Sequence, residues 1–536
     1  MHPRTLLIGL DGATFSILDS LIEQGIMPNL ERLLAAGTRA ELASVVPPLT
    51  PPAWTSLMTG RSPGSHGIFD FLRFELTTED RHLRVMDAWD VACETIWSMV
   101  THHGLRATVL NFPLTYPPPS IAGYVVPGWV PWRHLRLACH PADLYDRLKA
   151  LPGFDPRELA MDMSLEEKAL EGCHREEDYE ELIRLHIRRE RQWFKIAATL
   201  MREDPCHLTA VLFDGVDKLQ HICWRFIDPD LFSSTPSDLE LRIRELCLEY
   251  FREVDGFVGE IVAMGGPGAN TIIVSDHGFG PTVEVFYLNA WLHQHGYLAW
   301  ADGAEIEQKH AETLGLGTMA RRFYEVDWSR TTAYCPTPSS NGIYLFPPTS
   351  EGETAPSRKA YEDLRLKLTQ SLSSFTDPAT QQPVVTRIWT REEAFAGKHG
   401  ALAPDLTVSL RDGGFVSILP SDEVLKARPE PTGTHRPHGV FVAAGAGMRR
   451  GVSVEPLSIL DVAPAILYSL GLPVPEDLEG RVPTEIFEPS QLQSRPVAFE
   501  KSTRSAEPAR GQTTPPVDAD MEEEVLKQLR ALGYME

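Results

Sequence analysis

The feature that most constrains the fold is a repeated alternation of short apolar runs with helix-like segments. Residues 5–10, 207–213 and 271–275 are almost continuously apolar, as expected for strands that are buried on both faces of a parallel sheet. Amphipathic helical patterns lie between such runs, most clearly over 176–202 and 239–264. The alternation predicts an α/β fold with a mostly parallel central sheet and helices on both faces.

Acidic residues follow three of the apolar runs at their carboxyl ends. Asp11 ends the first run, Asp214 follows the second with Asp217 close behind, and Asp276 with His277 follows the third. Because the carboxyl ends of parallel strands meet along one edge of a sheet, these side chains are expected to converge on one crevice. Carboxylates and imidazoles gathered in this way are typical metal ligands.

Two of the candidate ligands have competitors nearby in the sequence. Asp217 and His221 are four positions apart at the predicted start of a helix, so both project from one face. That spacing suits a metal ion, although such a pair is more often a simple surface contact. Asp214 competes with Asp217, and the spacing to His221 favours Asp217. His438 likewise competes with His435, but it lies where the next strand begins, which favours His435.

Thr50 lies between a β-like run (40–46) and a predicted helix with Pro51 and Pro52 in its first turn. It is predicted to be the N-cap of that helix. Open α/β folds bind ligands at such junctions, and the positive end of a helix favours anions. By itself, such a threonine is most simply a cap. A chemical role for Thr50 therefore depends on the other motifs.

Taken together, these segments resemble the alkaline phosphatase superfamily, and within it the type I phosphodiesterase/nucleotide pyrophosphatase family and its bacterial members. The matching segments occur in the family's order: 7–12 (LIGLDG), 49–60 (LTPPAWTSLMTG), 62–68 (SPGSHGI), 217–221 (DKLQH), 274–280 (VSDHGFG), 433–437 (GTHRP) and 460–472 (LDVAPAILYSLGL). The sulfatases of the superfamily are disfavoured, because the chain has no Cys-x-Pro-x-Arg segment for their modified nucleophile.

The resemblance implies a two-metal site with Thr50 as the nucleophile beside the second metal. One metal would be held by Asp217, His221 and His435, and the second by Asp11, Asp276 and His277. Mixed carboxylate and imidazole ligands suit Zn²⁺, with Mn²⁺ or Fe as alternatives. The implied activity is hydrolysis of phosphodiester or pyrophosphate bonds in a small-molecule phosphate ester. A phosphomonoesterase on the same scaffold is the alternative, and a catalytically silent binding or scaffold protein is the alternative from another class.

The sequence departs from the eukaryotic members of the family next to Thr50. Those enzymes have an asparagine that helps to hold the phosphoryl oxygen where this chain has Phe71. Pro51 and Pro52 also lack N–H groups, so the first free helical amide is predicted at Ala53. We expect oxyanion stabilisation to depend more on the metals than it does in the eukaryotic enzymes.

The acidic composition and the terminal segments limit the remaining possibilities. A net charge of −24 argues against a surface that coats nucleic acid, and a phosphate site would need local positive charge such as a metal. No apolar run approaches the length of a membrane-spanning helix, and no signal-peptide pattern is recognised at the N-terminus. The seven scattered cysteines suit reduced thiols, so a cytoplasmic location is expected, with the oligomeric state left open.

We predict five segments in the chain. A catalytic core over 1–290 contains an irregular insertion at about 112–175, and an inserted cap or substrate region follows over 291–424. The core resumes over 425–488, followed by a flexible linker (489–520) and a C-terminal helix (521–536). Four aromatic residues are candidates for the wall of the substrate pocket, although core packing is the simpler role for each: Trp129, Trp132, Phe286 and Tyr287.

Overall fold

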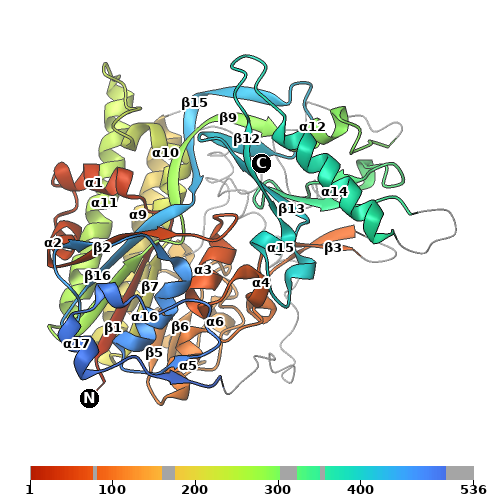
Figure 1. Ribbon diagram of the computed structural model, residues 1–536. Coiled ribbons are helices and arrows are strands. Elements are labelled where there is room, and N and C mark those ends of the chain that lie inside the picture. Colours follow the sequence, from red (N-terminus) through yellow and green to blue (C-terminus); the bar gives the residue numbers. More distant parts are fainter. Residues whose placement is uncertain (1, 77–80, 160–175, 302–322, 350–355, 503–536) are drawn as a thin grey trace.

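The computed structural model describes residues 2–76, 81–159, 176–301, 323–349 and 356–502. A large sheet lies between two layers of helices, and a smaller lobe projects from the carboxyl edge of that sheet (Figure 1). The α/β class with a mostly parallel sheet is therefore confirmed.

The main sheet has nine strands in the order β17–β2–β16–β8–β1–β7–β5–β6, with β18 also beside β2. Its pairs are parallel except those of β16, which runs antiparallel to both of its neighbours. The strands are β1 (Arg4–Leu10), β2 (Gly37–Ala43), β5 (Ala107–Leu110), β6 (Gly123–Val126), β7 (Leu208–Phe213), β8 (Ala269–Val274), β16 (His438–Ala444), β17 (Val452–Ser453) and β18 (Leu457–Ser458).

Helices cover both faces of this sheet, as predicted. Side chains of β1 alternate between the faces: Leu6 and Ile8 pack on one side and Leu7 on the other. The first face is covered by α1 (Phe15–Glu23), α2 (Pro28–Ala36), α9 (Glu176–Glu203), α10 (Gly215–Ile227) and α11 (Asp238–Gly265). The second face is covered by α3 (Thr50–Thr59), α5 (Ile96–His102) and α16 (Val462–Ser469).

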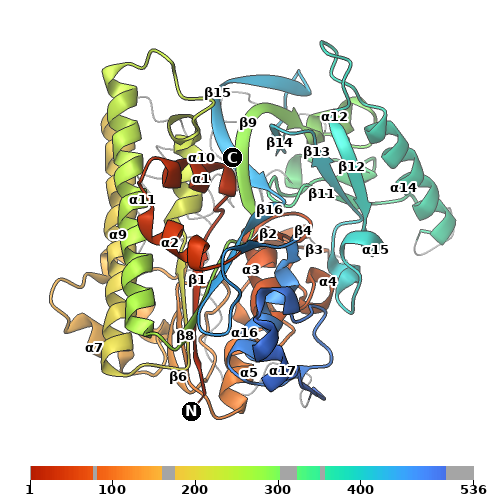
Figure 2. The ribbon, with the colours of Figure 1, turned by 60° about the vertical axis from the view of Figure 1, so that its left-hand side comes forward.

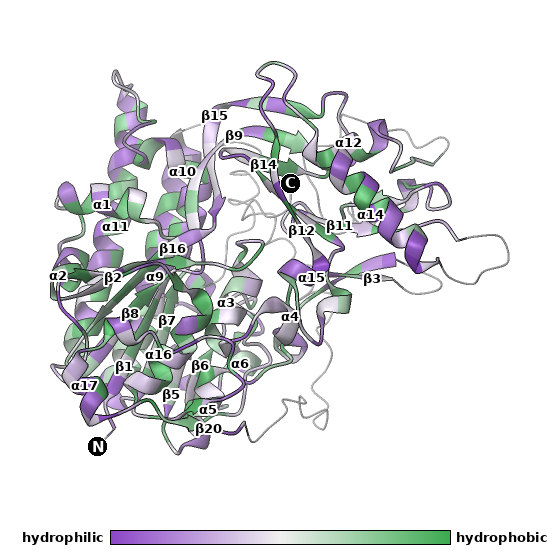
Figure 3. Cartoon of the chain, viewed as in Figure 1, coloured by the Kyte–Doolittle hydropathy of each residue, from purple (hydrophilic) through white to green (hydrophobic). Residues whose placement is uncertain are grey.

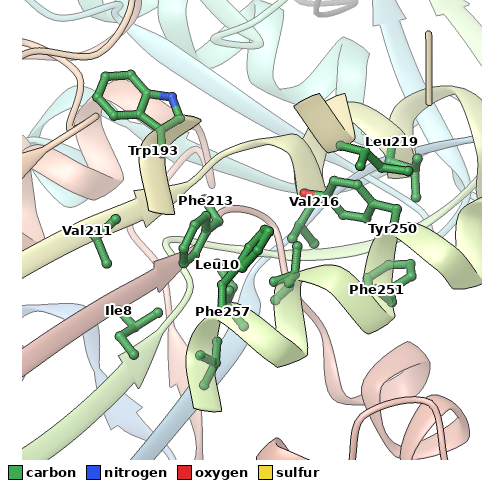
Figure 4. Packing of buried hydrophobic residues seen from close by; sticks show 14 of the residues in the cluster. Ile8, Leu10, Trp193, Val211, Phe213, Val216, Leu219, Tyr250, Phe251 and Phe257 are labelled. Carbon is green, nitrogen blue, oxygen red and sulfur yellow. The ribbon is translucent and has the colours of Figure 1, made fainter. Parts of the chain in front are cut away.

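The colouring by hydropathy agrees with this layering. The central strands are predominantly apolar, whereas the helices outside them alternate polar and apolar stripes (Figure 3). Figure 2 shows the long helices α9 and α11 side by side on one face, with α3, α5 and α16 on the other. Between α9, α11 and the sheet, aromatic and aliphatic side chains such as Phe213, Tyr250 and Phe257 fill the core (Figure 4).

The segment predicted as an irregular insertion at 112–175 contains regular structure. It provides β6, which extends the main sheet by pairing in parallel with β5, and the helices α6 (Leu135–Ala138), α7 (Leu144–Lys149) and η2 (Pro156–Leu159). The prediction missed β6 because Gly123–Val126 is only four residues long. Residues 160–175 lie outside the described part of the chain.

The smaller lobe begins and ends with two long strands that extend side by side from the carboxyl edge of the main sheet. These are β9 (Gly278–Tyr287) and β15 (Leu425–Arg436), which pair antiparallel, with β14 (Gly414–Ser417) on the other side of β9. Beyond them lies a four-stranded sheet of β10 (Ala333–Tyr334), β11 (Gly342–Leu345), β13 (Leu406–Leu410) and β12 (Val385–Thr390), with the helices α12 (Leu288–Gln294), α14 (Arg358–Ser373) and α15 (Arg391–Ala394). The predicted boundaries at 291 and 424 fall between the start of β9 and the end of β15, within the smaller lobe.

The smaller lobe has its own apolar cluster, which also includes the hairpin β3 (Leu72–Leu76) and β4 (Arg81–Val85). Phe286 is fully buried there and stacks on Phe375, so its role is core packing. Leu49, the residue before Thr50, belongs to the same cluster. The lobe is therefore packed directly against the start of α3.

The linker predicted from residue 489 begins too early, because residues 489–502 are structured. They form α17 (Pro489–Ser494) and β20 (Phe499–Glu500), which pairs with β19 (Val474–Pro475). The Tyr468 hydroxyl donates to Arg495 O at 2.7 Å, and the Arg495 guanidinium donates back to Tyr468 O. These tertiary contacts hold a segment whose composition alone is loop-like. The rest of the predicted linker and the predicted helix over 521–536 lie outside the described residues.

None of the described helices is both long enough and apolar enough to cross a membrane.

Candidate active site

Side chains from distant parts of the chain meet at the carboxyl edge of the main sheet. They follow β1 and β8, lie in the first two turns of α10, and reach in from the end of β15. These are the six predicted ligands, Asp11, Asp217, His221, Asp276, His277 and His435.

Asp217, His221 and His435 form one side of the site. Asp217 Oδ1 lies 3.3 Å from His435 Nε2, and Asp217 Oδ2 lies 3.5 Å from His221 Nε2. The Nε2 atoms of the two histidines are 3.2 Å apart. The side chains of Asp217 and His221 therefore lie on one face of α10, in line with their i, i+4 spacing, and the two histidines contact different oxygens of Asp217.

Asp11, Asp276 and His277 form the other side. His277 Nε2 lies 3.2 Å from Asp276 Oδ2 and 3.7 Å from Asp11 Oδ1. His277 also lies 4.0 Å from Asp217 Oδ1, and its ring stacks on that of His435 with centroids 3.7 Å apart. Ligand atoms within 4.8 Å of one another thus form two groups that share His277: Asp217, His277 and His435, and Asp11, Asp276 and His277.

The hydrogen bonds of the three histidines assign their tautomers. The Nδ1 atoms of His221, His277 and His435 lie within 3.1 Å of backbone carbonyl oxygens of Gly433, Gly278 and Pro48 respectively. A carbonyl only accepts, so each Nδ1 carries the proton and each neutral ring turns an Nε2 lone pair into the site. Metal-binding histidines are oriented by second hydrogen bonds of this kind.

The carboxylates also fit a cation. Asp11 Oδ1 and Asp276 Oδ2 are buried and accept no hydrogen bond from a described residue. An unpaired carboxylate oxygen in a protein interior is costly unless a cation or donor reaches it. The donor set of three carboxylates and three imidazoles is therefore chemically suited to divalent metals.

Burial and mutual repulsion dominate the electrostatics of the acidic side chains. Burial raises the pKa of Asp276 to about 8, and burial with the charges of Asp276 and Asp217 raises the pKa of Asp11 well above its ordinary value. Burial lowers the pKa of His277 and His435, which keeps these rings neutral.

Thr50 lies at the centre of this edge, but it is not the N-cap of α3. The helix begins at Thr50, and Leu49 is in the cap position with extended backbone dihedrals. The Ala53 N–H donates to Leu49 O at 3.0 Å, so the prediction that this amide is free is also wrong. Because Pro51 and Pro52 have no N–H, Thr50 carries the sole amide of the first three helical residues. Its Oγ1 lies 3.2 Å from His277 Nε2.

The two competing candidates lie in other environments. The buried carboxylate of Asp214 contacts Arg189, Lys218 Nζ at 2.7 Å, Asn111 Nδ2 at 3.0 Å and Trp129 Nε1 at 3.2 Å. With its acceptor sites occupied by these donors, it is a structural anion. His438 begins β16 and is exposed.

Sequence reasoning did not identify the side chains that hold the candidate ligand Asp11 and the structural anion Asp214. Trp54 Nε1 donates to Asp11 Oδ2 at 3.1 Å. Trp54 is four residues after Thr50, so the helical spacing was a signal that both face one site. Asn111 and Arg189 gave no local signal, because their contacts with Asp214 span 103 and 25 positions of sequence.

Phe71, where the eukaryotic enzymes have an asparagine, is part of an aromatic pair. The Phe71 ring stacks on Trp129, with centroids 5.3 Å apart and planes within 10°. Phe71 belongs to the same apolar cluster as Leu49, and Trp129, partly exposed, packs against that cluster. An apolar wall therefore lies beside the start of α3.

Comparison with known proteins identifies the family. The model of the type I phosphodiesterase/nucleotide pyrophosphatase family matches residues 5–439. The chain belongs to this family. As a family member it is a phosphoric ester hydrolase, and members of the family depend on two divalent metal ions.

Solved structures show how far the fold is shared. Phosphonoacetate hydrolase from Sinorhizobium meliloti 1021, solved with phosphonoacetate, is 18% identical with a TM-score of 0.52, covering 87% of this chain and 96% of the hydrolase. Murine ectonucleotide pyrophosphatase/phosphodiesterase 5 is 15% identical with a TM-score of 0.47, covering 88% of this chain and 95% of its own. At such identities the first likeness shows the fold alone. A search of curated proteins gives no match.

Proposed function

We propose that this family member cleaves phosphodiester or pyrophosphate bonds of a small-molecule phosphate ester, with Thr50 as the nucleophile at a two-metal site. The observation that carries the proposal is the orientation of the three imidazoles. Each is held at Nδ1 by a backbone carbonyl and turns Nε2 toward buried carboxylates beside the Thr50 hydroxyl.

The six ligands divide between two cations. Asp217, His221 and His435 would hold one, and Asp11, Asp276 and His277 the other, with Thr50 beside the second. The donor set favours Zn²⁺ over Mn²⁺ or Fe. When bound, two such cations supply positive charge that stabilises the attacking and leaving oxygens of an in-line displacement.

The residues of the chain position the reacting groups. Thr50 Oγ1 would attack phosphorus and lose its proton to solvent, the bond from phosphorus to the leaving oxygen would break, the leaving oxygen would take a proton from solvent, and a phospho-threonine ester would form. Water would then attack the same phosphorus, the bond from phosphorus to Oγ1 would break, and one proton of the water would restore the Thr50 hydroxyl. Pro51 and Pro52 have no N–H to offer the phosphoryl oxygens, so the oxyanion relies mainly on the cations.

The aromatic wall of Phe71 and Trp129 favours diesters over monoesters. A monoester presents one more charged oxygen, which requires a cation or donor beside it, whereas a diester presents a second organic group. The stacked rings suit an organic group. We propose that the cap region, 291–424, completes the substrate pocket. A cytoplasmic location is also proposed, from the scattered cysteines, and cell fractionation tests it.

The test compares bis-p-nitrophenyl phosphate with p-nitrophenyl phosphate, using metal-loaded wild type, Thr50→Ala and a matched control, Thr55→Val. Thr55 is one turn further along α3, and its buried Oγ1 accepts no hydrogen bond from a described residue. We expect wild type and Thr55→Val to prefer the diester, and Thr50→Ala to lose on the order of 10³-fold or more in kcat. Preference for the monoester would support the alternative. No hydrolysis of either ester would favour the silent scaffold.

A further inference from the structure

The N-terminus of α10 is capped by a side chain from a different helix. Asp214 is in the cap position, yet its side chain makes no capping hydrogen bond. Instead, Glu190 of α9 accepts a hydrogen bond from Gly215 N, with Oε1 at 2.7 Å. The first amide of α10 is thus satisfied from 25 residues away.

The reason that Asp214 does not cap is visible in its contacts. Its carboxylate is turned toward the buried cations of Arg189 and Lys218 and toward Asn111. Arg189 and Glu190 are consecutive on α9. Arg189 binds the Asp214 carboxylate, and Glu190 accepts the hydrogen bond from the first amide of α10.

Glu190 is itself tightly enclosed. It is 1% exposed, and the Tyr250 hydroxyl of α11 donates to the same Oε1 at 3.2 Å. A Cβ added to Gly215 would lie 2.7 Å from both Glu190 Oε1 and the Tyr250 hydroxyl, so the helix start has no room to shift. Tyr250, Val216 and Leu219 belong to one packed cluster, shown in Figure 4.

The hydrogen bond from Gly215 N to Glu190 lies in the same helical turn as one candidate metal ligand and one turn before another. Asp217 is the third residue of α10, and His221 is one turn further along the same helix. A displacement of the first turn would move both ligand atoms away from His435, which comes from β15. We propose that Glu190 is a positioning residue for the metal held by Asp217, His221 and His435. The proposal rests on the two-metal site of the proposed function.

Calorimetric titration of the metal-free full chain with Zn²⁺ alone tests the proposal without an activity readout. We expect two sites in wild type. Glu190→Leu should weaken one of them by roughly tenfold or more, because removal of groups that orient metal ligands typically costs that much. Glu190→Gln, which keeps an acceptor for Gly215 N, should bind nearly as wild type does. Glu181→Leu, exposed on the same helix, is the matched control.

A second variant covers the case in which Glu190→Leu does not fold. Gly215→Ala keeps the glutamate but pushes its carboxylate, and it should weaken the same site selectively. In a His221→Ala background, which removes that site, neither change should affect the remaining one.

The outcomes separate the two claims. Selective weakening of one site, absent from the His221→Ala background, supports the positioning role. Unchanged binding, or equal weakening of both sites, overturns it and leaves the two-metal site standing. A wild type that binds no Zn²⁺ would instead contradict the two-metal site itself, and the positioning role with it.

Discussion

The Nε2 atoms of His221 and His435 face each other at 3.2 Å, while the Nδ1–H of each ring donates a hydrogen bond to a backbone carbonyl. Two lone pairs at that distance repel unless a cation lies between or beside them. The anchoring carbonyls belong to Gly433 and Pro48, so the rings cannot turn away without breaking contacts on two separate segments. In the proposed site a metal ion would relieve this repulsion, so the protein is expected to be less stable when the metal is absent.

Removal of metal should lower the thermal stability of the protein. A ligand present at 100 times its dissociation constant stabilises the folded state by about 2.7 kcal/mol. We expect a chelator to lower Tm, measured by scanning calorimetry, and added Zn²⁺ to restore it. In His435→Ala the difference between the metal-loaded and metal-free proteins should shrink, whereas the exposed His438→Ala should behave as wild type. An unchanged Tm after verified removal of metal would contradict a metal-stabilised site.

The aromatic wall should determine the choice of the second ester substituent. An aromatic pair contributes about 0.5–1.5 kcal/mol beyond area burial, which corresponds to about a 2- to 12-fold effect. We expect Trp129→Leu to lower kcat/KM for bis-p-nitrophenyl phosphate by such a factor relative to methyl p-nitrophenyl phosphate, which has the same leaving group. Trp89→Leu is the control, since Trp89 is 46% exposed on the surface. Equal losses on both esters would argue against a contact with the second substituent.

His66 should make the folded state sensitive to acid. Burial, with a smaller contribution from His399, lowers the pKa of His66 to about 3. Its Nδ1 accepts a hydrogen bond from Ile68 N at 3.2 Å, and its Nε2 lies 2.9 Å from Ser56 Oγ. A second ring proton would be added at Nδ1, where it would face the Ile68 N–H. The folded state therefore binds fewer protons than the unfolded state. The stability that this causes is fully present above pH 6.5 and is lost as the pH falls toward 3.

Denaturant unfolding of the metal-free protein at several pH values between 3 and 7 measures this effect. One group contributes a slope of at most about 1.4 kcal/mol per pH unit. In His66→Gln the free energy of unfolding should fall less steeply with decreasing pH. His82→Gln, at a half-exposed position, is the control. Parallel slopes for wild type and His66→Gln would rule out a proton-linked role for this histidine.

The parts of the site that were predictable from sequence are those encoded in local patterns. Apolar runs ending in Asp11 and Asp276 predicted strand tips on one sheet edge, and the helical spacing of Asp217 and His221 predicted a shared face. Helix packing has no such local signature, so the contacts of Glu190 and Trp129 were not predictable. Thr50 was misplaced by one residue because prolines are compatible with several positions of a first turn.

Hydrogen bonds of Asp70 connect the segment that contains Phe71 to the smaller lobe. Its carboxylate accepts from Thr337 Oγ1 at 2.6 Å, Ser339 Oγ at 2.7 Å and Phe71 N at 2.6 Å. Asp70 is 5% exposed, and burial raises its pKa. Thr337→Val removes one donor from a buried carboxylate and leaves the shape of the side chain nearly unchanged. A hydrogen bond to a charged group contributes about 1.5–3 kcal/mol, so we expect the free energy of unfolding to fall by that amount.

Chemical denaturation at pH 7 measures this loss. Thr386→Val is the matched control, because Thr386 is exposed and its hydroxyl donates to the Ser409 and Leu410 carbonyls, and its substitution should cost under about 0.5 kcal/mol. In an Asp70→Asn background, where the carboxylate is neutral, Thr337→Val should cost less than in wild type. The difference between the two costs is the coupling energy of the Asp70–Thr337 pair. Equal costs in the two backgrounds would show that the Thr337 hydroxyl does not support the charge on Asp70.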